Sequence, residues 1–371
     1  MNALSLFANI GVAEAYLKDI GIEVVVANEI DKRRADLYQK IYPESKMICG
    51  DITNQLIFES IINESKKENV EIIMATPPCQ GMSTAGQQDE DDERNSLIVP
   101  VIKAIKCINP KYVFIENVPQ FVNTKIIVNE ESILIPDLIK KELGKDYHIN
   151  INIIDTADYS VPQTRERTIV LLSRKDAADI WLLPEKDAEI VTMRDAIGHL
   201  PSVDPFVRDI SQEEMDELFP LYEKRKKAAL KISKWHIPPV HIKRQVEAMM
   251  HTATGCTAFD NEIYYPKKEN GEPVRGYHNT YKRQNWDSPA YTVTMDNRKI
   301  SSQNNVHPGR ELKGGLYSDP RTLTVYEIML IMSLPSDWPI PPKTSEAFLR
   351  RIIGEGIPPL FVKKVFEQLL R

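Results

Sequence analysis

This sequence has few cysteines, no excess of positive charge and no long apolar run. Its 371 residues include four cysteines, and the formal net charge is −6. The cysteines form no C-x-x-C pair, and their wide spacing argues against a zinc site or a disulfide framework. No run approaches the ~18 apolar residues of a membrane span. The N-terminal stretch "MNALSLFANIGVAEAYL" lacks the basic region and cleavage site of a signal peptide. We therefore expect a reducing, cytoplasmic setting without membrane contact and without a global attraction to nucleic acid.

What is present is a hydrophobic fraction of 42%, enough for a large core, arranged in alternating strand-like and helix-like segments. The pattern predicts strands over residues 3–8, 23–31, 46–52, 70–76, 111–118, 148–156 and 167–175. It predicts helices over residues 12–20, 55–69 and 96–108. Nearly unbroken Val/Ile runs are typical of a parallel sheet that is buried on both faces. We therefore predict an α/β, doubly wound, Rossmann-like domain.

The alternation stops near residue 185, where the chain becomes rich in Pro, Lys, Tyr and Asn. We interpret residues 186–347 as a second, smaller, irregular domain, and residues 1–185 with 348–371 as the first domain. The C-terminal tail, from residue 345, ends in an amphipathic helix. Eight basic residues against two acidic ones within 221–250 form either a solvated helix face or part of a surface for an acidic partner.

Polar residues follow the predicted strands at the edge where such folds bind ligands. Glu29 follows the second strand, where a carboxylate can hold ribose hydroxyls, and Asp51 follows the third, where it can accept from an adenine amine. The turn after the first strand, residues 7–12, lacks the G-x-G-x-x-G spacing of a dinucleotide binder. We expect a helix to begin there and to offer free N–H groups to a carboxylate. Together these features favour an adenosine ligand without a pyrophosphate, such as S-adenosylmethionine.

The stretch "MATPPCQGMS" at 74–83 places Cys79 directly after two prolines. Prolines fix the backbone and remove donors, so this stretch is neither a helix nor a central strand. Cys79 is then either a buried, inert thiol beside a turn or a nucleophile at the end of a strand. The other cysteines, Cys49, Cys107 and Cys256, have no such setting and are predicted to be buried and inert.

Five spaced motifs extend this interpretation over nearly the whole chain. They are "PPCQGMS" at 77–83, "ENV" at 116–118, "DYSVPQTRERTIVLLS" at 158–173, "RTLTVYEIMLIMSLPSDW" at 321–338 and "IIGEGIPP" at 352–359. In this order they resemble the DNA (cytosine-5) methyltransferase family of the bacterial or phage type. The resemblance implies a Rossmann-like S-adenosylmethionine-dependent methyltransferase domain and a smaller target-recognition domain.

The resemblance implies a role for each catalytic residue. Cys79 would add to C6 of a flipped-out cytosine, because a thiolate addition makes C5 nucleophilic and divides a hard step into easier ones. Glu116 would bind the base at N3 and at the exocyclic amine. Arg165 would contact the base O2 and stabilise the thiolate, and Arg167 would support the site. Asn117 is expected to order the loop around Glu116, and residues 81–96 to close over the flipped base.

The resemblance also implies a pocket for S-adenosyl-L-methionine, which leaves as S-adenosyl-L-homocysteine, and no metal. Its predicted lining is Phe7, Ala8, Asn9, Ile10, Gly11, Glu29, Ile30, Asp51, Ile52, Pro78, Leu97, Glu355 and Ile357. Two of these residues depart from the family pattern. Asn9 stands in a turn where the family has more glycine, and Asn tolerates left-handed φ better than most residues. Glu355 replaces the usual Asn of the last motif, and a carboxylate there would attract or repel the charges of the cofactor.

Double-stranded DNA is the partner that the resemblance implies. The resemblance leaves open whether a cognate restriction endonuclease acts on the same site. A DNA partner favours the interpretation of the basic run at 221–250 as part of a DNA-binding surface. Candidate DNA contacts are Gln80, Ser83, Gln163, Lys224, Arg225, Lys243, Arg244, Lys282, Arg283 and Arg298. Two alternatives stay open: a tRNA cytosine-5 methyltransferase of the same fold, and a DNA-binding protein that has lost catalysis. The expected location is the bacterial cytoplasm or nucleoid, or a phage-infected cell.

Overall fold

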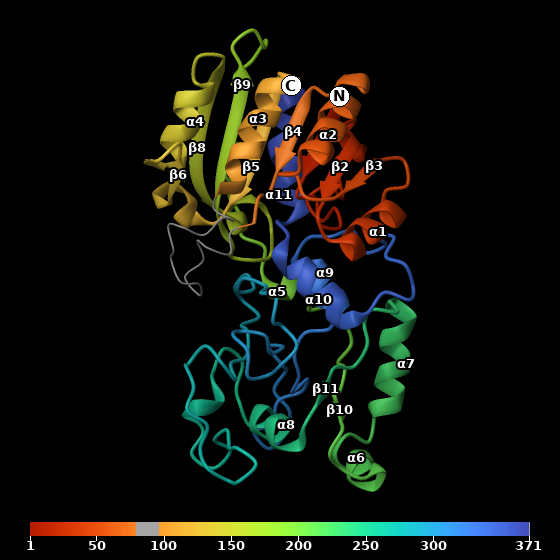
Figure 1. The fold of residues 1–371 in the computed structure, drawn as a ribbon. Coiled ribbons are helices and arrows are strands. Elements are labelled where there is room, and N and C mark those ends of the chain that lie inside the picture. Colours follow the sequence, from red (N-terminus) through yellow and green to blue (C-terminus); the bar gives the residue numbers. More distant parts are fainter. Residues whose placement is uncertain (79–95, 371) are drawn as a thin grey trace.

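The computed structural model of this protein describes residues 1–78 and 96–370, and its centre is a seven-stranded sheet (Figure 1). The strand order is β3-β2-β1-β4-β5-β9-β8. The bounds are β1 Asn2–Leu6, β2 Glu23–Glu29, β3 Lys46–Cys49, β4 Ile72–Ala75, β5 Tyr112–Asn117, β8 Tyr147–Asp155 and β9 Glu166–Arg174. The first five strands in sequence pair in parallel. The α/β, doubly wound prediction is therefore confirmed.

Strand β9 is antiparallel to both of its neighbours, β5 and β8, so the prediction of a wholly parallel sheet is wrong at this edge. Only residues 156–165 connect β8 to β9, with a 3-10 turn over Thr156–Tyr159. A parallel pair needs a crossover of about a dozen residues or more, usually with a helix, so this short connection returns the chain in the opposite direction.

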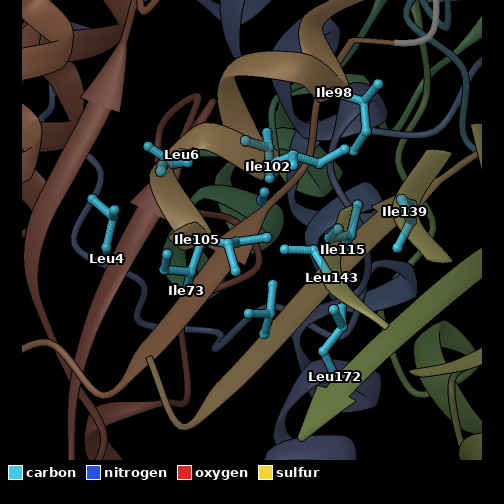
Figure 2. Packing of buried hydrophobic residues seen from close by; sticks show 14 of the residues in the cluster. Leu4, Leu6, Ile73, Ile98, Ile102, Ile105, Ile115, Ile139, Leu143 and Leu172 are labelled. Carbon is cyan, nitrogen blue, oxygen red and sulfur yellow. The ribbon is translucent and has the colours of Figure 1, made fainter. Parts of the chain in front are cut away.

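Helices cover both faces of the sheet. The elements are α1 Lys32–Ile41, α2 Gln55–Lys67, α3 Ile98–Ile108, α4 Ile135–Leu143 and α11 Pro359–Glu367. On one face, α2, α3 and α4 bury an aliphatic cluster against alternate strand residues such as Leu4, Leu6, Ile73 and Ile115 (Figure 2). On the other face, α11 packs Phe361 and its neighbours against Ala3, Ile72 and Phe114. Burial on both faces is the reason that these strands are almost uniformly apolar.

The helix predicted over residues 12–20 is replaced by consecutive turns and a short 3-10 helix at Lys18–Ile20. Backbone hydrogen bonds here span three residues rather than four, as from Glu14 N–H to Gly11 O and from Leu17 N–H to Glu14 O. These tight turns carry the Glu14 side chain, which is buried and accepts from the Tyr38 hydroxyl of α1. The expected helix N-terminus after β1 is therefore absent, and so is the anion site that it would have provided.

The sequence pattern did not predict α1, α4 or the hairpin that precedes α4. Residues 125–134 form a hairpin of β6 Lys125–Val128 and β7 Glu131–Leu134, and α4 follows it directly. The hairpin reverses through Asn129 and Glu130, which both have left-handed φ.

The second part of the chain has little regular structure. Its elements are α5 Met193–Ile197, β10 Phe206–Val207, α6 Gln212–Leu218, α7 Tyr222–Ile232, β11 Val240–His241, α8 Lys243–Met250 and α9 Val325–Ile331. Buried arginines donate hydrogen bonds to backbone carbonyls, which in a sheet would accept from neighbouring strands. Arg321 donates to Val203 O and pairs with Asp319 and Glu327, while Arg283 donates to Met249 O and His307 O. Each arginine has five N–H donors, so these side chains can connect segments that no β-sheet hydrogen bonds hold together.

The two parts share a core. Helices α5, α9 and α10 (Glu346–Glu355) lie between the sheet and the lower lobe in Figure 1. One apolar cluster joins residues of these helices to Ile10 and Val12 of the turn after β1 and to Leu37 of α1. It also contains Trp235, Trp286 and Trp338. The domain division at residues 186 and 347 stays a prediction, because this core crosses it.

Three further sequence expectations concern single features. Within the described residues, no helix is long and apolar enough to span a membrane. In the same residues, no group of three or more His, Cys, Asp or Glu side chains could hold a metal ion. Cys49, Cys107 and Cys256 are exposed, so the prediction that these thiols are buried is wrong.

Candidate active site

The ends of β4 and β5 meet beside the Pro77-Pro78 stretch. The Asn117 side chain donates from Nδ2 to Pro77 O over 3.1 Å, and its Oδ1 accepts the Val118 N–H over 2.9 Å. Asn117 is 3% exposed, so both bonds lie away from solvent. As predicted, Asn117 orders this loop: it fixes the carbonyl two residues before Cys79 against the strand that carries Glu116. Cys79, Gln80, Ser83 and the predicted closing loop at 81–96 lie outside the described residues, apart from Ser96.

Glu116 is the second-last residue of β5 and lies next to an arginine from the antiparallel strand β9. The Arg167 Nε lies 2.7 Å from Glu116 Oε1, and the two side chains are 14% and 11% exposed. Antiparallel pairing places Glu116 opposite Ile169 and Asn117 opposite Thr168, which brings Arg167 to the end of β5. The structure thus joins a carboxylate and a guanidinium at the sheet edge beside the Pro77-Pro78 stretch. Such a pair can hold the carboxylate oriented toward a ligand.

Arg165 has a different environment, although it lies only two residues before Arg167. Its side chain is 2% exposed and donates from Nη1 to Val293 O over 3.1 Å and from Nη2 to Gly354 O over 3.0 Å. Its backbone N–H donates to Asp155 Oδ1 over 2.8 Å. Arg165 therefore joins β9 to the 293 segment and to the end of α10. The two arginines of the Q-x-R-x-R motif have different partners, which the sequence does not distinguish.

The turn after β1 has strained backbone geometry. Phe7, Asn9 and Gly11 all have positive φ, at 58°, 52° and 79°. The prediction that Asn9 tolerates the left-handed region is confirmed. At Gly11 a Cβ atom would lie 2.1 Å from the Tyr42 ring, so only glycine fits. The Tyr42 hydroxyl donates to Gly11 O over 2.6 Å and holds the turn in place.

Glu29, at the end of β2, is bound to this turn. Its carboxylate accepts the Asn9 N–H and the Asp31 N–H, each over 2.9 Å, and the residue is 5% exposed. Burial raises the pKa of Glu29, and these backbone N–H groups and Arg34 oppose the rise. Each carboxylate oxygen keeps a second lone pair, so the group can still accept ligand hydroxyls.

The other predicted pocket residues gather at the same edge. Asp51 is exposed and accepts the Thr53 N–H through Oδ1, which leaves Oδ2 available, and the Ile30 side chain is 63% exposed nearby. Pro78, three residues after the end of β4, and Leu97, directly before α3, are both half-buried. Four of the predicted residues are mostly buried in apolar clusters, so their part is to shape the edge: Ala8, Ile10, Ile52 and Ile357.

Glu355 is also present at this edge, but as part of an ion pair. Arg34 of α1 approaches its carboxylate to 2.7 Å, and Asn9 donates to it over 3.4 Å. Sequence reasoning missed Arg34. The available signal was its position five residues after Glu29, in the first turn of a helix that begins at the ligand edge of the sheet.

The predicted DNA contacts separate into buried and exposed groups. Arg283 is fully buried and donates to backbone carbonyls, and Gln163 is fully buried and bonds Met332 Sδ and Val293 N–H. Both predictions are wrong for the described structure, because neither side chain reaches the surface. Lys224 and Arg298 are exposed, whereas Lys282 is half-buried and donates to the Tyr291 hydroxyl over 3.1 Å.

The remaining basic candidates are engaged by acidic partners within the lobe. Arg225 pairs with the buried Asp204 at 2.5 Å, and Lys243 pairs with Glu214 at 3.1 Å. Arg244 lies 3.5 Å from Glu269. The Lys243 and Arg244 pairs are surface pairs of small energy, so a phosphate can compete for their cations. Arg225 is the exception, because its removal would leave a buried carboxylate unpaired.

A buried carboxyl beneath the turn makes stability depend on pH. Glu14 is 3% exposed, and burial raises its pKa to about 7, although hydrogen bonds from Ser5 and Tyr38 lower it. Between its ordinary pKa of 4.5 and 7 the unfolded chain loses this proton while the folded chain keeps it. The free energy of unfolding therefore falls as pH rises through this window, by up to about 3 kcal/mol.

Urea unfolding of the wild type and of Glu14→Gln across pH 4.5 to 8 measures this effect. We expect the wild type to lose stability relative to Glu14→Gln as pH rises. The difference between their free energies of unfolding should level off above about pH 7. Glu59→Gln, which removes an exposed carboxyl on α2, is the control and should follow the wild-type profile. Parallel profiles for the wild type and Glu14→Gln would contradict the assignment.

Comparison with known proteins gives one consistent result. A family model described as C-5 cytosine-specific DNA methylase matches residues 1–371. The chain is 44% identical to the Type II methyltransferase M1.HgaI of Avibacterium volantium, over 99% of this chain and 97% of that protein. It is 24% identical to M1.HphI of Haemophilus parahaemolyticus, over 99% and 86%.

Solved structures share the fold. A putative DNA modification methyltransferase from an Escherichia coli prophage superimposes with a TM-score of 0.65 at 19% identity, over 100% of this chain and 98% of that one. A variant of Spodoptera frugiperda DNMT2 gives a TM-score of 0.60 at 16% identity, over 100% and 99%.

Proposed function

The chain belongs to the C-5 cytosine-specific DNA methylases, and on this premise we propose that it methylates C5 of cytosine within a specific sequence of double-stranded DNA. The enzyme class follows from the family; the target, the residue roles and a type II restriction-modification setting are the proposal. The observation that carries it is the Glu116–Arg167 pair at 2.7 Å, beside the Pro77 loop that leads into Cys79.

The residues at the sheet edge fit S-adenosylmethionine, the methyl donor that the family uses. Two carboxylates with remaining acceptor capacity, Glu29 and Asp51, suit ribose hydroxyls and an adenine amine. The tight turn at Asn9 and Gly11 lets the backbone approach a ligand closely. Asn9 Oδ1 is buried without a hydrogen-bond partner among the described residues, so an acceptor is available to a ligand donor. When bound, this cofactor supplies the methyl group.

The chain's own residues prepare the base. Cys79 adds to C6 of a cytosine that has left the helix, because C5 by itself is a poor nucleophile. Glu116 binds N3 and the exocyclic amine and stabilises the charge that develops on the ring. Once the methyl group is on C5, a base removes the C5 proton and Cys79 leaves by elimination.

We propose that the two arginines exchange the roles that the resemblance implies. Arg167 is the one beside Glu116, so it is the better candidate to contact the base O2. Arg165 is engaged by the carbonyls of Val293 and Gly354 and positions the segments around the site. Lys224 and Arg298 stay candidates for phosphate or base contacts in the smaller lobe.

Bisulfite sequencing of plasmid DNA from cells that express the chain tests the function directly. We expect complete methylation at one short sequence and none elsewhere. Transfer of labelled methyl groups to tRNA but not to DNA would overturn the DNA assignment in favour of a tRNA enzyme. Neither product, with DNA binding retained, would identify a DNA-binding protein without catalysis.

A further inference from the structure

A closed ring of polar contacts joins the ends of β1, β2 and α10. The Asn9 N–H and the Asp31 N–H donate to the two oxygens of Glu29, each over 2.9 Å. Asp31 Oδ1 accepts the Arg34 N–H over 3.0 Å at the start of α1. The Arg34 side chain pairs with Glu355, and Asn9 Nδ2 donates to Glu355 Oε2 over 3.4 Å. The ring thus begins and ends at Asn9 and encloses the end of β2.

The ion pair is the strongest contact of this ring. Arg34 Nη1 lies 2.7 Å from Glu355 Oε2, and Nη2 donates to Oε1 over 3.2 Å, so the pair is bidentate. The side chains are 21% and 18% exposed, which limits screening by solvent. Arg351 adds a second, exposed guanidinium at 3.4 Å. The Glu355 carboxylate is therefore neutralised inside the protein and is not a bare charge at the cofactor site.

The two departures from the family pattern, Asn9 and Glu355, contact each other. Asn9 has left-handed φ, and its side chain donates to Glu355 and to Ile352 O, each over 3.4 Å. A glycine at position 9 would adopt this φ easily but would lose the side-chain hydrogen bonds from the turn to the end of α10. An asparagine at position 355 would leave Arg34 without its partner. Each departure thus supplies the contact that the other needs.

We propose that Arg34 and Glu355 are positioning residues for cofactor binding, which act with Asn9 to clamp the 7–11 turn against Glu29. The inference rests on the proposed cofactor site at this edge. A turn held in its binding geometry before the ligand arrives costs less conformational entropy on binding. Breaking the pair should weaken binding and leave the chemical step nearly unchanged. Arg165 donates to the backbone carbonyl of Glu355 over 3.4 Å, and this contact does not involve the carboxylate.

Titration calorimetry with S-adenosylhomocysteine and full-length protein tests the pair through a double-mutant cycle. We expect Arg34→Ala and Glu355→Gln each to raise Kd about five- to tenfold. The double variant should be no weaker than the weaker single variant, because one interaction is lost in all three. Arg34→Lys should restore part of the affinity, since it keeps the charge but not the bidentate geometry. Lys40→Ala, which removes an exposed cation from the same helix, is the matched control and should bind like the wild type.

Steady-state methyl transfer supplies a second readout. KM for S-adenosylmethionine should rise in parallel with Kd, while kcat at saturating cofactor stays within about twofold. Wild-type protein that does not bind S-adenosylhomocysteine would overturn the proposed cofactor site itself. Wild-type binding with Kd unchanged in both single variants, or with additive losses in the double variant, would overturn the positioning role alone. Thermal unfolding checks each variant, and Arg34→Gln, which removes the charge of the ion pair but keeps a polar side chain, replaces Arg34→Ala if that variant does not fold.

Discussion

Replacement of Cys79 by serine should lower methyl transfer at least ~10³-fold and leave DNA binding close to that of the wild type. A serine hydroxyl is far less ionised than a thiol near neutral pH and is a much weaker nucleophile toward C6. The Pro77 carbonyl is fixed by Asn117, so the loop that leads into position 79 does not depend on the thiol. Labelled methyl transfer and a gel-shift assay on the same DNA measure the two properties.

Cys256→Ser is the matched control, because Cys256 is exposed and belongs to the other lobe. DNA that contains 5-fluorocytosine adds a direct test, since fluorine at C5 prevents the elimination that releases the enzyme. The wild type and Cys256→Ser should form a covalent adduct with this DNA, and Cys79→Ser should form none. Methylation retained by Cys79→Ser would refute the covalent mechanism.

The second large effect concerns the pair at the end of β5. Glu116→Gln should lower kcat by about 10²–10³, because the neutral amide cannot stabilise the charge that develops on the base. Arg167→Ala should lower kcat by about 10², since it leaves a largely buried carboxylate without its cation. Glu116→Gln should unfold at nearly the wild-type temperature, and Arg167→Ala should unfold at a moderately lower one, because Glu116 keeps its charge without a partner. Single-turnover methyl transfer and thermal unfolding separate the chemical effect from the structural one.

Arg165→Ala is the informative comparison for Arg167→Ala. Its guanidinium bonds Val293 O and Gly354 O inside the protein, so its loss should destabilise the fold by about 2–4 kcal/mol. We therefore expect the larger drop in unfolding temperature for Arg165→Ala and the larger drop in kcat for Arg167→Ala. The reverse pattern would restore the roles that the resemblance implies.

The sequence was sufficient for whatever depends on local pattern. Val/Ile runs and their spacing placed all seven strands of the main sheet, and the Pro-Pro-Cys, Glu-Asn-Val and Q-x-R-x-R motifs identified the family. The helix expected at 12–20 did not form, because a buried Glu14 and a left-handed Gly11 favour tight turns that periodicity does not reveal. The antiparallel edge was missed for a related reason: direction depends on the length of the 156–165 connection, not on strand composition.

Side-chain partners were decided by the tertiary structure alone. Arg165 and Arg167 are alike in sequence, yet one is enclosed by carbonyls from residues 293 and 354 and the other faces Glu116. Arg283 was predicted to contact DNA, but its side chain is buried and donates to backbone carbonyls. Thus the sequence by itself determined the fold class, the family and the order of the motifs. Only the tertiary structure decided which charges meet, as Arg34 and Glu355 do across 321 positions, because such contacts depend on how distant elements pack.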